Sequence, residues 1–554
     1  MNISFQILLF AVLFGITAPG RKSTVKTVVN PPNIILILSD DIGYSDIGCY
    51  GGEIQTPNLD YLASEGVRFS QFYNGARCCP TRASLLTGLY PHQAGVGFMT
   101  GALGNTVAYQ GHLKKEVKTV ADYLGEAGYI TIHVGKWHVG NRSNQTLPLD
   151  KGFDRSWSRE GKVNYWNTSR VYENGISRPA KPGERRYLTD VQGDKAVEWV
   201  EEAVKQKTPF FMYMAFNAAH WPLHAKDQDI KKYRGSYMAG WEKIRSKRID
   251  RLEAIGMIEK IDPGLTRDPS VPTWHSIAPG NKYDGYHAVT SGQHDQDDWD
   301  LKMSVYAAQI DCMDQNIGKI VAKLKALEQY ENTIIMYLQD NGACAEGIGK
   351  NDPEKPGTPG SYIAYGLPWA NLSNTPFKMY KHFVHEGGIS TPFIFSWPSQ
   401  LPAGKKGTIH KASYGHLIDI IPTCLDALGV YDRKSYPSLE GKSLLPAIKG
   451  EESRHDRAIF WEHEGNRAIR KEDWKLLSRY KNDYRYFKAW GWEKEPREKE
   501  WELYNMKKDR WELNDLSSEY PKVVKELKNE YHQWYRKVGA IPREQVIKGS
   551  KHKF

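Results

Sequence analysis

Short apolar runs alternate with longer amphipathic helical patterns along most of the chain, and this alternation constrains the fold more than any other feature. The run "NIILILSDD" begins the series at Asn33, and "YITIHVGKWH", "PFFMYMAFNAAHWP", "TIIMYLQDNG" and "TPFIFSWP" continue it. Helical patterns such as "LTDVQGDKAVEWVEEAVKQ" and the segment from Asp300 to Leu327 stand between them. Strands that are apolar throughout are typical of a mostly parallel sheet covered by helices on both faces, so the sequence predicts an α/β fold of this kind.

The character of the sequence changes after about Glu451. The segments "AIFWEHEGNRAIRKEDWKLL" and "EKEWELYNMKKDRWELNDL" favour antiparallel hairpins, and residues 521–538 favour a terminal helix of alternating charge. We expect a main domain over residues 21–450 and a smaller C-terminal α+β subdomain, containing an antiparallel sheet, over residues 451–554. Residues 226–299 are rich in charge, Gly, Pro and His, and we expect this insertion to line a pocket.

One apolar run extends from Ile3 to about Ala18 and is closed by Pro19 and Gly20. Its length suits a secretory signal better than a membrane-spanning helix, so residues 1–20 are predicted to be a signal peptide and the protein to be periplasmic or secreted. Its start carries no Lys or Arg and no A-x-A site follows it, which leaves a retained membrane anchor as the alternative. Contact with a membrane is expected only in that case.

The composition is that of a globular protein, neither fibrous nor disordered, with 554 residues of which 40% are hydrophobic and 25% charged. A formal net charge of +10 favours an anionic partner. No recognised nucleic-acid motif accompanies this charge, so a nucleic acid is not the expected partner. The six cysteines have spacings that resemble neither a disulfide framework nor a zinc ribbon.

Polar side chains gather where four of the predicted strands end. One such ending is more often a turn or a helix cap, but four in one sheet predict a site, because ligands of open α/β sheets bind beyond the carboxyl ends of the strands. Carboxylate and amide oxygens are hard ligands that suit calcium or magnesium better than zinc or copper. The residues concerned are Asp40, Asp41, Lys136, His138, His220, Asp340 and Asn341.

The segment "CCPTRASLLTG" raises the question of a reactive thiol. Pro80 fits the first turn of a helix that ends at Gly88, which would put Cys78 just before a helix N-terminus and Arg82 in the first turn. An exposed thiol there would have a lowered pKa and could act directly as a nucleophile. A small buried residue at a tight turn is the alternative, and the composition leaves both open.

This segment resembles the signature of the type I sulfatases, C-x-P-[ST]-R-x-x-x-L-x-G, in which the first cysteine is oxidised to formylglycine. Cys78 is then the modified residue, because a start at Cys79 would leave no spacer before Pro80. The resemblance spans nearly the whole mature chain and is closest in look to bacterial arylsulfatases. Its blocks, in the family's order, are "PNIILILSDDIGYSDIGCYGG", "TPNLDYLASEGVRFSQFY", "GYITIHVGKWHVG", "MYLQDNGA", "HEGGISTPFIFSWP" and "WELYNMKKDRWELNDL".

The resemblance implies an alkaline-phosphatase-like fold and a role for each matching residue. A divalent cation, calcium with magnesium as the alternative, would be bound by Asp40, Asp41, Asp340, Asn341 and the hydrated formylglycine at position 78. Sulfate and hydrate oxygens would be held by Arg82, Lys136 and Lys381, and protons would be handled by His138 and His220. Many members carry an arginine where this chain has Lys378, so Lys381 is assigned by its distance to "EGG" and Lys378 is expected to be peripheral.

The implied reaction is hydrolysis of a sulfate ester. The formylglycine hydrate attacks sulfur while His220 protonates the leaving alcohol, which gives a sulfo-enzyme intermediate. His138 then takes the proton of the remaining hydroxyl, inorganic sulfate leaves, and the aldehyde is regenerated. An unmodified cysteine has no second hydroxyl for this elimination, so a formylglycine-generating maturation enzyme is an implied partner.

The export signal, the basic charge and the large insertion favour a sulfated carbohydrate or polysaccharide as the substrate. An aryl sulfatase that acts on small sulfate esters is an alternative, and so is a phosphonate or phosphodiester hydrolase, because the same nucleophile and metal can attack phosphorus. A non-catalytic protein that only binds sulfated glycans is disfavoured, since all the expected catalytic residues are present.

Overall fold

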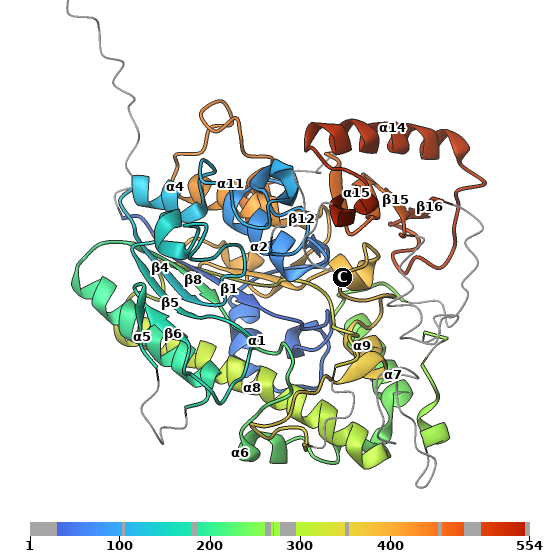
Figure 1. Ribbon diagram of the computed structural model, residues 1–554, viewed down its shortest axis with the longest axis horizontal. Coiled ribbons are helices and arrows are strands. Elements are labelled where there is room, and N and C mark those ends of the chain that lie inside the picture. Colours follow the sequence, from blue (N-terminus) through green and yellow to red (C-terminus); the bar gives the residue numbers. More distant parts are fainter. Residues whose placement is uncertain are drawn as a thin grey trace, which may run out of the picture.

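The computed structural model describes residues 30–101, 106–179, 186–260, 268–269, 271–277, 295–348, 354–451, 457–480 and 500–548. The signal peptide expected over residues 1–20 lies outside this part of the chain. Figure 1 shows a large central sheet between two layers of helices, with a smaller sheet near the C-terminus. Within the described ranges, no helix combines the length and the apolar character needed to cross a bilayer.

The central sheet has ten strands in the order β11-β2-β10-β9-β1-β8-β4-β5-β6-β7. Its middle is parallel from β9 to β5, whereas β10 runs antiparallel to both of its neighbours. The prediction of a mostly parallel sheet is confirmed for this middle part. The strands are β1 (Asn33–Ser39), β2 (Gly66–Phe69), β4 (Ile130–Gly135), β5 (Arg155–Arg159), β6 (Val171–Glu173), β7 (Ile176–Ser177), β8 (Phe210–Ala215), β9 (Thr333–Gln339), β10 (Phe393–Ser396) and β11 (Thr408–His410).

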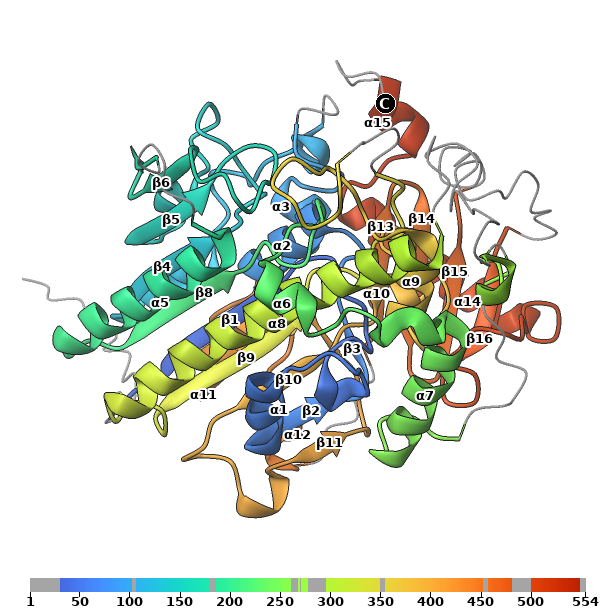
Figure 2. The same cartoon turned by 90° about the horizontal axis from the view of Figure 1, so that it is seen from below.

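Alternate residues of β1 belong to two separate hydrophobic clusters, one on each face of the sheet. Ile35 and Ile37 belong to one cluster, and Ile34 and Leu36 belong to the other. Because neither face meets water, residues 34–38 of the strand are all apolar, which is why the sequence shows an unbroken run. Figure 2 shows α5 (Leu188–Lys205) and α8 (Gln296–Ala326) lying along one face. The helices of the other face include α2 (Cys78–Thr87), α4 (Val120–Glu126) and α11 (Ile420–Ala427).

The long helix expected from Asp300 begins four residues earlier, at Gln296. The side chain of Asp295 accepts a hydrogen bond from the backbone N–H of Asp298 and so caps the helix. The remaining helices and short strands are α1 (Pro57–Ser64), α3 (Pro91–Ala94), α6 (Asp227–Lys231), α7 (Trp241–Ala254), α9 (Gly366–Ser373), α10 (Glu386–Ile389), α12 (Leu445–Lys449), α15 (Arg543–Lys548), β3 (Phe72–Tyr73) and β12 (Gly415–His416).

A four-stranded antiparallel sheet follows near the C-terminus, in the order β13-β14-β15-β16. The helix α14 (Pro521–Lys537) packs on it through Leu527, Tyr531 and Trp534. The expected antiparallel sheet is therefore confirmed, while the domain boundary between residues 450 and 451 stays a prediction. The strands are β13 (Ile459–His463), β14 (Asn466–Lys471), β15 (Trp474–Ser478) and β16 (Glu502–Asn505).

Candidate active site

Cys78 is the first residue of α2, and Arg77 is the N-cap in an extended conformation. The sequence placed Cys78 just before the helix, so this expectation is corrected by one residue. Cys78 is also buried, with 1% of its surface exposed, and so is every other residue of α2. The pKa of Cys78 is nevertheless well below its ordinary value, since Cys79 donates a hydrogen bond to it and Lys136 and His138 lie nearby, while burial acts in the opposite direction.

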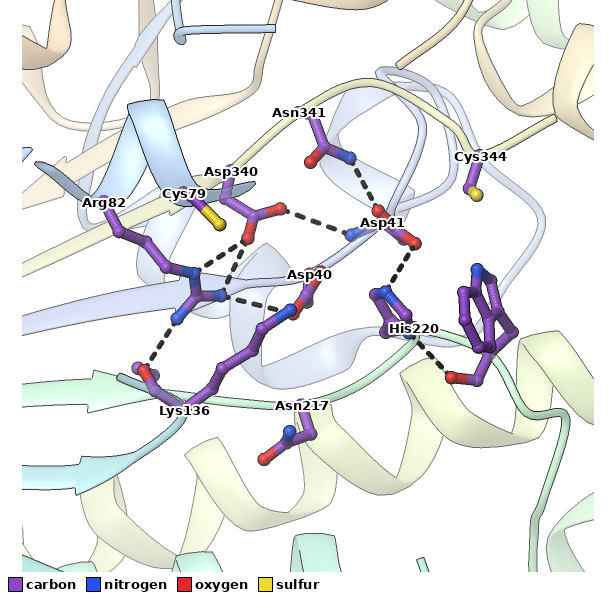
Figure 3. A network of polar contacts seen from close by, with 12 residues as sticks. Asp40, Asp41, Cys79, Arg82, Lys136, Asn217, His220, Asp340, Asn341 and Cys344 are labelled. Atoms are coloured by element: carbon purple, nitrogen blue, oxygen red, sulfur yellow. Dashed lines mark hydrogen bonds and ion pairs between the residues drawn. The ribbon is translucent and has the colours of Figure 1, made fainter. Parts of the chain in front are cut away.

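Two parallel strands bring the predicted oxygen ligands together. In the β1–β9 pair, Ser39 lies opposite Gln339, so the residues that follow both strands meet at one edge of the sheet. The backbone N–H of Asp41 donates to Oδ1 of Asp340 at 3.4 Å, and Nδ2 of Asn341 donates to Oδ1 of Asp41 at 2.7 Å. Figure 3 shows Asp40, Asp41, Asp340 and Asn341 converging on one small region, and all four are buried.

Arg82 and two lysines form ion pairs with these carboxylates. Arg82 donates from Nε and Nη2 to Oδ2 of Asp340 at 3.0 and 2.8 Å, and from Nη2 to Oδ2 of Asp40 at 3.3 Å. Lys136 forms an ion pair with Asp40, and Lys381 lies 2.8 Å from Oδ1 of Asp41. The third nitrogen of Arg82 donates to the carbonyl of Lys136 at 2.8 Å, so each of its three guanidinium nitrogens has a protein partner.

The protonation of the carboxylates follows from these contacts. Burial raises the pKa of both Asp40 and Asp41, but nearby cations bring both pKa values below the ordinary value. Lys136 and His220 lower the pKa of Asp40, and Lys381 and His220 lower the pKa of Asp41. The pKa of Asp340 is well above its ordinary value, because burial and the nearby Asp40 disfavour a further negative charge. The site therefore has more buried carboxylates than its own cations fully stabilise.

The donor set fits one divalent cation. Oδ1 of Asp40 and Oδ1 of Asn341 are buried and have no hydrogen-bond partner in the described part of the chain. A buried oxygen without a donor is costly unless a cation or water satisfies it. Three carboxylates and one amide oxygen are the hard ligands that calcium and magnesium prefer, so the arrangement can hold such an ion.

Two histidines flank this group. His220 Nε2 lies 3.5 Å from Oδ2 of Asp41, and its Nδ1 donates to the carbonyl of Trp221 at 2.7 Å. Because a carbonyl only accepts, this contact leaves Nε2 as the nitrogen that is available for proton transfer. His138 lies beside Cys78 and Cys79, and burial lowers its pKa.

A cavity of about 480 Å³ opens over the site. Of the predicted residues, Cys78, Lys136, His138, His220 and Lys381 line it, whereas the four oxygen ligands and Arg82 do not. Lys378 also lies away from it, where its Nζ is 3.3 Å from the hydroxyl of Tyr504. None of the described residues of the insertion 226–299 lines the cavity, and residues 261–267, 270 and 278–294 lie outside the described part.

Other residues that line the cavity were not expected from the sequence. Glu346 lies 2.9 Å from Arg77 and accepts a hydrogen bond from Nε1 of Trp221 at 3.0 Å. Burial would raise the pKa of Glu346, but Lys381 and Arg77 lower it to about 2. Further unexpected lining residues are Arg159, Lys162, Arg170 and Tyr362. Arg159 ends β5, but this strand lacks the apolar run by which the other strands were recognised, so the rule of polar strand ends did not reach it.

Comparison with known proteins agrees with this geometry. A sequence model of the sulfatase family matches residues 32–430, and one for the C-terminal region of N-sulphoglucosamine sulphohydrolase matches residues 377–537. An arylsulfatase of Klebsiella aerogenes is 34% identical over 445 residues, which cover 75% of this chain and 90% of that protein. An N-acetylglucosamine-6-O-sulfatase of Bacteroides thetaiotaomicron is 27% identical over 559 residues, which cover 92% of this chain and 86% of that protein.

A solved structure extends the similarity to three dimensions. The crystal structure of Ps i-CgsB in complex with k-i-k-neocarrahexaose matches with a TM-score of 0.65 and 25% sequence identity, over 94% of this chain and 95% of that one. The expected alkaline-phosphatase-like fold is thereby confirmed. With a family match that covers most of the chain and a site of buried carboxylates, lysines and histidines around Cys78, the protein belongs to the sulfatase family and is a sulfuric ester hydrolase.

Proposed function

We propose that the protein hydrolyses sulfate esters of a sulfated carbohydrate, and that it does so with formylglycine at position 78 and one calcium ion. The observation that carries the proposal is the convergence of Cys78, two lysines and two histidines on one cavity, beside four buried oxygen ligands. A sulfate monoester spreads negative charge over three oxygens, so its hydrolysis needs positioning and positive charge more than anything else. The residues of this cavity offer both.

Two groups would supply chemistry that the genetically encoded side chains lack. Oxidised to formylglycine and hydrated, residue 78 would supply an oxygen nucleophile and a second hydroxyl that allows sulfate to leave. Calcium, held by Asp40, Asp41, Asp340 and Asn341, would supply positive charge against the sulfate oxygens.

The other side chains bind the substrate and move protons. Lys136 and Lys381 hold the sulfate oxygens, because both ammonium groups lie at the cavity and are kept charged by Asp40 and Asp41. Arg82 acts through the carboxylates that it binds and so positions Asp340 and Asp40.

His220 delivers a proton from Nε2 to the leaving alcohol, while the Trp221 carbonyl fixes its ring. His138 takes a proton at residue 78, beside which it lies. This role needs a neutral imidazole, and burial favours that form by lowering the pKa of His138.

The choice of a carbohydrate over a small aryl sulfate is supported by three observations. The cavity exposes the rings of Trp221 and Tyr362, which suit the apolar face of a sugar. The chain carries a net charge of +10, which suits a polyanion. A related protein is named an N-acetylglucosamine-6-O-sulfatase, and a related structure contains a neocarrahexaose. The arylsulfatase of Klebsiella aerogenes makes small aryl sulfates the second candidate.

The proposal includes maturation and export. Formation of formylglycine requires a separate maturation enzyme in the producing cell. The apolar run from Ile3 to Ala18 supports a periplasmic or secreted protein, with membrane attachment only where this run is retained.

The test combines peptide mass spectrometry across residue 78 with a sulfate-release assay on the same preparation. The expected result is conversion of Cys78 to formylglycine together with release of inorganic sulfate from carbohydrate sulfates. Converted protein that releases sulfate from aryl esters alone would refute the carbohydrate substrate. Converted protein that turns over phosphate diesters faster than sulfate esters, or that binds sulfated glycans without cleaving them, would refute the proposed reaction.

A further inference from the structure

The cavity contains a second group of cations that the proposed chemistry does not use. Arg159, Lys162 and Arg170 line the same cavity as Lys136 and His138. We call these three residues the basic wall. Lys136 pairs with Asp40, and Arg82 pairs with Asp340 and Asp40, whereas the residues of the basic wall contact neither Cys78 nor the oxygen ligands.

The sheet topology explains why the basic wall faces the same cavity. Arg159 is the last residue of β5, and β5 runs parallel to β4, which leads directly into Lys136. In the antiparallel β5–β6 pair, Arg159 lies opposite Val171, and the backbone N–H of Glu160 donates to the carbonyl of Arg170 at 3.0 Å. The two arginines are therefore neighbours across one hairpin, at the carboxyl edge of the parallel strands.

Within the described residues, the basic wall forms no ion pair, although Glu160 lines the same cavity. Arg159 donates to two backbone carbonyls, those of Asn167 at 3.0 Å and Gly161 at 3.4 Å. The adjacent carboxylate of Glu160 instead pairs with Arg142 at 3.6 Å. Partial burial, and then the proximity of Arg170, lower the pKa of Arg159, and an anion bound beside the two guanidinium groups would offset both effects.

Aromatic rings stand beside these cations. The rings of Trp221 and Tyr362 meet edge to face with centroids 5.4 Å apart, and Nζ of Lys162 lies 5.8 Å from the centroid of Tyr362. Both rings line the cavity. A cavity that combines an aromatic surface with guanidinium groups fits a sugar ring that carries an anionic substituent.

We propose that the basic wall is a subsite for a second sulfate group, carried by the same saccharide whose scissile sulfate ester reaches residue 78. This inference rests on the proposed function and narrows its substrate class to saccharides that bear at least two sulfates. Arginine is suited to this task, because its planar guanidinium donates two parallel hydrogen bonds to an oxyanion. The scissile sulfate is held by Lys136 and Lys381, and the second sulfate sets the orientation of the sugar.

The experiment compares matched saccharides as competitors of 4-methylumbelliferyl sulfate hydrolysis. One pair is glucosamine 6-O-sulfate and glucosamine 2-N,6-O-disulfate, and the other is neocarrabiose with one sulfate and with two. For the parent enzyme we expect the disulfated member of at least one pair to have an inhibition constant about tenfold lower, as one added charge-assisted contact predicts. In the double variant Arg159→Gln/Arg170→Gln this ratio should fall to about one.

The readout is the ratio of the two inhibition constants measured with the same variant, so a general loss of activity does not change it. Arg178→Gln is the matched control, because Arg178 follows β7 in the same sheet, is exposed and does not line the cavity. This control should keep the parent ratio. Equal inhibition by both members of each pair in the parent enzyme, or a preference that survives in the double variant, would overturn the inference.

Binding calorimetry with the same proteins and the same four saccharides separates this inference from the proposed function. Loss of the disulfate preference in the double variant would support the basic wall even if no preparation released sulfate, in which case the proposed reaction alone would fall. Sulfate release without any such preference would leave the proposed reaction standing and refute the basic wall.

Discussion

At the scale of single residues, the site uses backbone conformations that ordinary side chains avoid. Asp41 follows β1 with φ of +58°, and His138 follows β4 with φ of +59°. Left-handed conformations of non-glycine residues are uncommon, and they persist where the surrounding structure fixes them. Asp41 is fixed by Asn341 and Lys381. Two of the residues with this strained conformation are therefore ones to which we assign metal binding and proton transfer.

Two neighbouring lysines allow a sharp test of the assigned roles. We expect Lys381→Ala to lower kcat/KM for 4-methylumbelliferyl sulfate by about 10²- to 10³-fold, because a buried cation beside Asp41 and the cavity is lost. Lys378→Ala is the control, since Lys378 contacts Tyr504 outside the cavity, and it should change kcat/KM by less than about threefold. Steady-state kinetics of both variants decide, and a larger loss in Lys378→Ala would contradict the assignment.

The oxygen ligands predict that the thermal stability of the protein depends on a bound metal ion, and this can be measured without an activity assay. Chelation with EGTA should lower the Tm and abolish sulfate release, and calcium should restore both. A ligand at 100 times its Kd stabilises the folded state by about 2.7 kcal/mol, enough to be measured by scanning calorimetry. Asn341→Ala should reduce this stabilisation, because it removes an unpaired buried oxygen from the site. Restoration by magnesium and not by calcium would show that the ion is misassigned.

At the scale of secondary-structure elements, a buried ion network connects the segment that carries Lys381 to the C-terminal sheet. Glu386, at the start of α10, lies 2.9 Å from Nζ of Lys475 in β15 and 3.0 Å from Nε of Arg510. Lys475 also lies 2.7 Å from Glu512. The pKa of Glu386 is about 2, because Lys475 and Arg510 outweigh the effect of burial. The network can therefore fix the position of α10 relative to the C-terminal sheet.

Replacing Lys475 should show how much this connection contributes to stability. Lys475→Met leaves Glu386 and Glu512 buried without their shared cation, so we expect a loss of about 3–5 kcal/mol in the free energy of unfolding. Lys471→Met in β14 is the control, because Lys471 forms a partly exposed pair with Glu530 at 2.9 Å and should cost less than about 1 kcal/mol. Urea unfolding measures both, and equal losses would mean that the buried network adds nothing beyond a surface pair.

The elements also show what could be read from the sequence and what could not. The apolar strands β1, β4, β8 and β9 were predicted, because burial on both faces leaves an unmistakable run. The strand β5 was not, since "RSWSR" has no such run, and Arg159 was missed with it. The antiparallel direction of β10 depends on how the chain returns to the sheet, which hydrophobicity does not encode. The burial of Cys78 depends on the packing of α2 in a cluster contributed by distant segments.

At the scale of the whole molecule, both faces of the central sheet are buried, and ionisable groups are enclosed with the apolar ones. His133 lies in β4 among the rings of Trp137, Phe153 and Tyr213. Burial lowers the pKa of His133 to about 3 and, in a separate environment, that of His385 to about 3. Both histidines are therefore neutral in the folded protein at pH values where an unfolded histidine is protonated.

This difference predicts that acid destabilises the fold. Unfolded histidine titrates near pH 6.5, so between about pH 6.5 and pH 3 the unfolded chain binds a proton at His133 that the folded chain does not. The free energy of unfolding should therefore fall with pH through this window, by up to about 1.4 kcal/mol per pH unit for each such histidine. In His133→Phe the fall between pH 6.5 and pH 5 should be shallower, whatever the variant's stability at pH 8.

Tyr213→Phe is the matched control, because it alters the same ring cluster without removing a group that titrates in this range, since burial raises the pKa of Tyr213 to about 12. Its unfolding free energy, measured in urea at pH 5, 6, 7 and 8, should run parallel to that of the parent protein. If His133→Phe also ran parallel to the parent, protonation of His133 would not be coupled to folding. The acid sensitivity would then have to arise from the remaining buried groups, of which His385 is the first to replace.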